Sequence, residues 1–140
     1  MIHPSDFTDA HRRHWHDAEL LHLHACWPNA DQLYGFSAEC GLKAVMKAQG
    51  MPVDPTGKPI RRRHRQHIEF LWSAFVSFAN GHNGARYVQL LPSGRPFGDW
   101  SHHNRYAHGR HFRQADIEPH RDAAREVCKM VQQATQDGLL

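Results

Sequence analysis

The chain has 140 residues, with 17 Lys and Arg, 14 Asp and Glu and 14 His, a formal net charge of +3 and a pI near 9.0. This length suits a single domain, residues 1–140, and the mild basicity permits an anionic partner without requiring one. Because no run approaches the roughly 18 apolar residues that cross a bilayer, and the polar N-terminus lacks a signal peptide, we expect a soluble, cytoplasmic protein with no membrane partner.

Two helices are predicted in the first third of the chain. The first begins at a cap formed by Asp6 or Thr8 and ends near Cys26, with an apolar stripe along one face. The second begins at Asn29, which forms a capping box with Gln32, and ends at a glycine, position 50. Within it, Glu39 and Lys43 stand one helical turn apart among apolar residues, and spacing alone favours a solvated ion pair as much as a special role.

The rest of the chain predicts two more helices and a long loop. A basic run at 61–67 leads into an apolar helix that ends at Gly81. Residues 83–91 fit a short helix or a strand. Residues 92–111 are rich in Gly, Pro, Ser, Asn and His, and the last helix follows, with Pro119 near its first turn and Gly138 beyond its end.

These elements predict an all-α fold, namely an antiparallel bundle of four to five helices with a long loop before the last helix. An irregular stretch of this length inside a compact domain is usually functional or disordered. The apolar stripes, which include Trp15, Trp27 and Trp72, are generous for a small bundle. We therefore expect a buried interface and a homodimer.

The abundant histidines do not predict a metal site. His14 and His16 are two residues apart, so on a helix they point to different faces. His11 and His14 are three apart, but no cysteine or carboxylate pattern completes a tetrahedral set. The three cysteines form no CxxC pair and read as reduced, buried side chains, and no nucleotide-binding or metalloprotease motif is present. We predict no metal and no cofactor, with a His-rich metal-binding protein as a distant third hypothesis.

The segment 99–112, DWSHHNRYAHGRHF, concentrates aromatic, cationic and imidazole side chains. Arg suits phosphate contact, Tyr or Trp stacks on bases, and His transfers protons near neutral pH. Metal-independent RNA cleavage needs these groups, because one imidazole takes the 2′-OH proton, a guanidinium stabilises the transition state and an acid protonates the leaving oxygen. A polar loop with surface histidines would have the same composition.

The helix-two motif resembles that of HEPN domains. GFSAECGLKAVMKAQGM at 35–51 is similar to the second helix of that family, and DAELL at 17–21 to its first. The matching positions of the motif are Ala38, Glu39, Leu42, Lys43 and Ala44. The segment 67–72 resembles the third helix, and NRYAHGRH lies where the family carries an Arg-to-His motif. The resemblance covers roughly positions 10 to 135.

This resemblance implies an all-α homodimer and, in active members, a metal-independent endoribonuclease. The family's Arg and His fall on Arg105 and His111, with five residues between them and His108 as an assisting group. The accompanying candidate substrate-binding residues are Arg95, His102, His103, Asn104, Tyr106 and Arg110.

Other assignments stay open. Arg95 and His102 form the second choice for the Arg-to-His pair, and Arg61 or Arg62 with His67, as well as Arg113 with His120, satisfy the same spacing. The Arg-Tyr form at positions 105–106 also resembles relatives that look non-catalytic. The alternative function is therefore a nucleotide-binding or partner-binding module that works with a nucleotidyltransferase-type protein.

Overall fold

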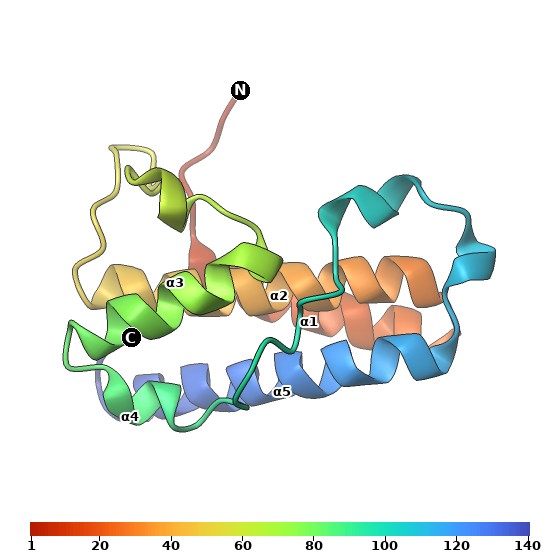
Figure 1. The fold of residues 1–140 in the computed structure, drawn as a ribbon. Coiled ribbons are helices and arrows are strands. Elements are labelled where there is room, and N and C mark those ends of the chain that lie inside the picture. Colours follow the sequence, from red (N-terminus) through yellow and green to blue (C-terminus); the bar gives the residue numbers. More distant parts are fainter.

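The computed structural model describes residues 1–140 and contains five α-helices, three short 3-10 helices and no strand. The α-helices are α1 (Phe7–Leu23), α2 (Trp27–Ala48), α3 (Ile68–Asn80), α4 (Ala85–Val88) and α5 (Gln114–Gln136), and the 3-10 helices are η1 (Arg62–His64), η2 (His102–Tyr106) and η3 (Gly109–His111). The predicted all-α bundle with a long segment before the last helix is confirmed (Figure 1).

The first two helices form an antiparallel hairpin. Asp6 caps α1, since its Oδ1 accepts a hydrogen bond of 2.9 Å from the backbone N–H of Asp9. The helix ends at Leu23, before the predicted end at Cys26, because the chain turns at Ala25, whose φ is +58°. Cys26 is exposed, which corrects the expectation of a buried thiol.

The predicted capping box at the start of α2 is wrong. The helix already begins at Trp27, and Pro28 occupies its first turn, where the missing N–H costs no hydrogen bond. Asn29 and Gln32 therefore lie inside the helix. Gln32 is buried and donates to the backbone carbonyl of Ser101. A residue predicted to cap its own helix thus makes a contact with a segment distant in the sequence.

Helix α2 is the centre of the fold, and α1, α3 and α5 pack around it. Its core face is fully buried, and the largest buried side chains of the protein gather around that face. They include Tyr34, Leu42 and Met46 of α2, Leu71 and Phe75 of α3, Phe97 and Trp100 of the long loop, and Ile117 and Met130 of α5.

Helix α5 runs parallel to α2 and antiparallel to α1 (Figure 1). The contacts agree: Asp31 near the start of α2 meets His120 near the start of α5, and further along Gly41 lies against Val127. Arg121 of α5 makes two hydrogen bonds of 2.9 Å to the Glu19 carboxylate of α1. The antiparallel arrangement is thus limited to α1 and its neighbours.

The parallel course of α5 requires the chain to return to the other end of the bundle, and residues 89–113 do so. We call these residues the crossing segment. It leaves α4, which settles the undecided stretch as a helix, and crosses the bundle to reach η2 and η3 beside the start of α5 (Figure 1). Helix α5 begins at Gln114, where Asp116 caps the Arg113 N–H, so Pro119 lies in the second turn rather than the first.

The basic run before α3 is anchored by one side chain. Its four arginines are exposed, whereas His64 of η1 is 1% exposed and packs edge-on against Phe78 of α3. Burial lowers the pKa of His64, so this ring is neutral near pH 7 and belongs to the core. The arginines are thereby held on the surface next to the start of α3.

Candidate functional site

The Glu39–Lys43 pair of α2 is buried. The side chains are 12% and 7% exposed, and Lys43 Nζ donates to Glu39 Oε2 at 3.0 Å. The interpretation as a solvated surface pair is therefore wrong. A buried ion pair is costly unless its remaining hydrogen-bonding capacity is used, so the other Glu39 oxygen needs a partner.

That partner is His67, the residue that precedes α3. His67 Nδ1 donates to Glu39 Oε1 at 2.8 Å. This hydrogen bond raises the pKa of His67 above its ordinary value, against the opposing effect of partial burial. Glu39 thus links the buried Lys43 to an imidazole that is 39% exposed.

A second carboxylate–imidazole pair lies beside the first. His102 Nδ1, from η2, is 3.3 Å from Oε1 of Glu69 in the first turn of α3. Glu69 is almost wholly buried, and its other oxygen, Oε2, has no hydrogen-bond partner. Each carboxylate accepts from Nδ1 of its histidine, and Nε2 of His67 and Nε2 of His102 make no hydrogen bond within the protein.

The two pairs meet through their rings. The ring centroids of His67 and His102 are 4.2 Å apart, and those of His102 and His103 are 4.1 Å apart. We call His67, His102 and His103 the imidazole cluster. It joins the start of α3 to η2, two segments far apart in the sequence, on a partly exposed surface.

Helix η2 is held in place by buried contacts from the residues before it. The Trp100 indole donates to the Asp31 carbonyl at 2.9 Å, and Gln32 Nε2 donates to the Ser101 carbonyl at 2.8 Å. A Cβ atom at Gly35 would collide with the Trp100 ring, so glycine is what lets Trp100 lie against α2.

The same end of the crossing segment is bound to α5 by three charged side chains, Asp31, Asp99 and His120, which we call the clasp. His120 is 4% exposed, and its Nδ1 and Nε2 lie 2.6 Å from Asp31 Oδ1 and 2.9 Å from Asp99 Oδ1. Burial lowers the pKa of His120, but the two carboxylates outweigh it and raise the pKa above the ordinary value. The clasp therefore fixes Asp99 and, with it, the chain that enters η2.

The sequence-predicted site residues fall into two groups. Five belong to η2, and three to η3 or its cap, while Arg95 is an exposed residue earlier in the crossing segment. The η2 group is His102, His103, Asn104, Arg105 and Tyr106, and the η3 group is His108, Arg110 and His111.

The predicted catalytic pair is not joined in the structure. Arg105 donates to the His102 carbonyl and to the Tyr106 hydroxyl, and its guanidinium lies 4.6 Å from the Tyr106 ring centroid. His111 is exposed on η3 and makes no side-chain hydrogen bond, whereas Nδ1 of His108 accepts from the Arg110 N–H. Arg105 thus belongs with the imidazole cluster rather than with His111.

The second choice, Arg95 with His102, is not joined by a hydrogen bond either, since the exposed Arg95 side chain makes none and His102 pairs with Glu69. Glu69 was not predicted as a site residue from the sequence, and His67 was included only among several histidines that satisfy the Arg-to-His spacing. Two signals were present: His67 precedes a helix that is otherwise apolar, and the Glu39–Lys43 pair interrupts an apolar run.

No set of three or more His, Cys, Asp or Glu residues is arranged to hold a metal ion, and no helix is both long and apolar enough to cross a membrane. No family model, no curated protein and no solved structure significantly matches the chain.

Proposed function

We propose that the protein is a HEPN-like, metal-independent endoribonuclease of the cytoplasm that acts at the imidazole cluster. The observation that carries this proposal is the pairing of Glu39–His67 with Glu69–His102, whose rings are 4.2 Å apart and whose Nε2 atoms are both unengaged. Two adjacent imidazoles can supply the acid and the base that cleavage of a ribose phosphodiester requires.

In the proposed reaction the RNA 2′-oxygen attacks the adjacent phosphorus. One imidazole takes the 2′-OH proton, the bond from phosphorus to the 5′-oxygen breaks, and a second imidazole gives a proton to that 5′-oxygen. The products are a 2′,3′-cyclic phosphate and a 5′-hydroxyl end. No water and no redox partner enters this step.

The environments of the two rings favour distinct roles. The hydrogen bond to Glu39 raises the pKa of His67, so we assign His67 as the acid, which leaves the neighbouring His102 as the base. Arg105, which is bound to the His102 carbonyl, is near enough to the cluster to contact the phosphate. The Arg105–His111 pair implied by the HEPN resemblance is the competing assignment for the same reaction.

A second candidate function is a non-catalytic module that binds a nucleotide or a nucleotidyltransferase-type partner. Tyr106 is 76% exposed and lies against the Arg105 guanidinium, an arrangement that suits stacking on a base. Such binding needs no proton transfer, so the two candidates differ in whether the histidines matter for turnover or only for affinity.

The test is cleavage of mixed RNA in EDTA, with end-group analysis and a separate binding measurement. We expect 2′,3′-cyclic phosphate ends, loss of at least about a hundredfold in rate for His67→Ala and His102→Ala, and retained binding in both. His16→Ala, which removes an exposed imidazole on α1, is the matched control and should cleave normally.

Three outcomes would change the proposed catalytic residues, the proposed function or the proposed chemistry. If His111→Ala abolishes cleavage while His67→Ala does not, the Arg105–His111 pair is the catalytic one. If binding occurs without cleavage of any RNA, the binding module is the better description. If cleavage requires a divalent ion, the proposed chemistry is wrong.

A further inference from the structure

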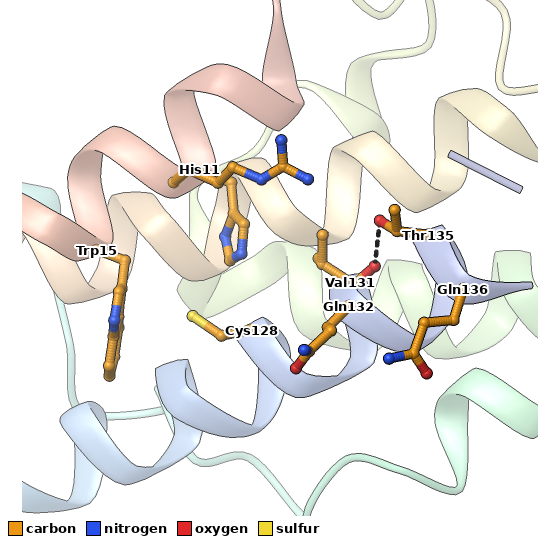
Figure 2. Close-up of a pocket in the computed structure, with 8 residues that line it drawn as sticks. His11, Trp15, Cys128, Val131, Gln132, Thr135 and Gln136 are labelled. Carbon is orange, nitrogen blue, oxygen red and sulfur yellow. Dashed lines mark hydrogen bonds between the residues drawn. The ribbon is translucent and has the colours of Figure 1, made fainter. Parts of the chain in front are cut away.

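A groove between α1 and α5 lies outside the site described above. It is a half-open groove of about 480 Å³, within the range of roughly 300 to 1,000 Å³ that is usual for small-molecule sites. Figure 2 shows residues of both helices around it. Its polar and aromatic lining includes His11, Arg12 and Trp15 of α1 and Gln132 and Gln136 of α5.

His11 gives the groove a specific hydrogen-bond acceptor. The residue is 3% exposed, and its Nδ1 donates to the Ser37 carbonyl at 2.8 Å, which fixes the hydrogen on Nδ1. Burial lowers the pKa of His11, so the ring stays neutral. Nε2 is then an unprotonated acceptor with no partner in the protein, and it is available to a ligand donor, N–H or O–H.

The other lining side chains indicate which further chemical groups a ligand of this groove would carry. Arg12 is exposed and forms no ion pair, so it is available to a carboxylate. Trp15, from the next turn of α1, packs against the core and has the Arg125 guanidinium 5.9 Å from its ring centroid, so a flat ring meets only the part of the indole that these neighbours leave exposed. Gln132 and Gln136 add amides that form no hydrogen bonds within the protein.

We propose that this groove binds a planar aromatic acid that carries a ring N–H donor, with the donor on His11 Nε2, the ring against Trp15 and the carboxylate on Arg12. An indole carboxylic acid has this combination and a two-ring size that the groove accommodates. The site is independent of the imidazole cluster and does not rest on the ribonuclease proposal.

The probes for a calorimetric titration of the whole protein are indole-3-acetate, its 1-methyl derivative and 3-methylindole. We expect one indole-3-acetate per chain. The 1-methyl derivative lacks the donor and 3-methylindole lacks the acid, so each should bind about tenfold more weakly. Arg12→Gln should weaken indole-3-acetate about tenfold and leave 3-methylindole unchanged, while Arg13→Gln, which alters a neighbour paired with Asp9, should change neither.

A blocking variant tests the location without disturbing the core. Gln132→Trp fills the groove from the exposed side of α5 and should abolish binding, whereas Lys129→Trp, whose side chain lines a different hollow beside Pro92 and Pro96, should not. The proposal is overturned if no probe binds at about 1 mM, if the 1-methyl derivative binds as well as its parent, or if Gln132→Trp binds normally. It is also overturned if Gln132→Trp converts a dimer to a monomer, because a second copy of the chain then fills the groove.

Discussion

Nδ1 of His120 lies 2.6 Å from Oδ1 of Asp31, and both side chains are at most 5% exposed. The second ring nitrogen faces Asp99, so both nitrogens meet carboxylate oxygens, which only accept hydrogen bonds. Burial raises the pKa of Asp31 above its ordinary value, but wherever both carboxylates are ionised the two ring nitrogens carry hydrogens and the ring is a buried imidazolium. Loss of either hydrogen would place a lone pair against a carboxylate and weaken the clasp that holds the crossing segment.

The clasp predicts a stability change in alkaline solution. A histidine whose pKa is raised by folding adds stability that is fully present below its unfolded pKa of about 6.5 and lost as pH rises through the folded pKa. We expect the free energy of unfolding, from urea titrations, to fall above about pH 6.5. Asp99→Asn should lower the folded-state pKa of His120, so the fall should still begin near about pH 6.5 but be smaller and end at a lower pH. The control Asp122→Asn, which alters an exposed carboxylate of the same helix, should follow the wild-type curve.

Glu39 is expected to set the proton affinity of His67. Glu39→Gln replaces the carboxylate that raises the His67 pKa with a neutral amide, so NMR titration should give a lower pKa for that ring. The same change strands Lys43 and should cost about 3 kcal/mol of stability. The double variant Glu39→Gln/Lys43→Met should recover part of this loss while the His67 pKa stays low. Glu118→Gln, which takes the carboxylate from His22 instead, should leave His67 unchanged.

The helices and most of the core could be predicted from the sequence, because apolar periodicity and terminal signals such as Asp6 and Gly81 are local. The site could not be predicted in this way. His67 and His102 meet only because the crossing segment returns beside the start of α3, and no local pattern encodes that juxtaposition. The Arg-to-His spacing was uninformative for a related reason, since a chain rich in both residue types satisfies it several times. The capping role predicted for Gln32 is wrong for the same reason, because its partner, the Ser101 carbonyl, lies far away in the sequence.

Gly35 should tolerate no side chain. An alanine Cβ would collide with the Trp100 ring, which is held by its bond to the Asp31 carbonyl, so Gly35→Ala should cost about 1 to 3 kcal/mol. Because Trp100 precedes η2, the variant should also disturb the His102 resonance. Gly109→Ala adds a Cβ at ordinary contact distance from Pro28 and serves as the control. Equal stability of the two variants in urea titrations would contradict the packing described for Trp100.

The basic run is expected to follow an RNA backbone toward the imidazole cluster. Arg61, Arg62, Arg63 and Arg65 are exposed, form no ion pairs and lead directly to His67. Replacing all four by Gln should weaken RNA binding and flatten the dependence of log K on log salt, because fewer counterions are released. A matched variant, Arg86→Gln with Arg125→Gln, removes cations that already pair with acids and should have a smaller effect. Unchanged affinity at low and high salt would assign the run to solubility alone.

The exposed apolar side chains indicate which surface the expected homodimer would bury. Trp72 is buried, and Trp15 and Trp27 pack against the core, so the tryptophans do not supply a free interface. We expect Leu20 and Leu23 of α1 to supply it instead, since they are 47% and 76% exposed and three residues apart on one helix face. We expect light scattering to show a dimer at tens of micromolar, roughly the range of a modest interface, and a monomer for Leu20→Glu/Leu23→Glu with unchanged helical content. Leu90→Glu, on the crossing segment, should remain dimeric, and a wild-type monomer at these concentrations would leave the imidazole cluster to act within a single chain.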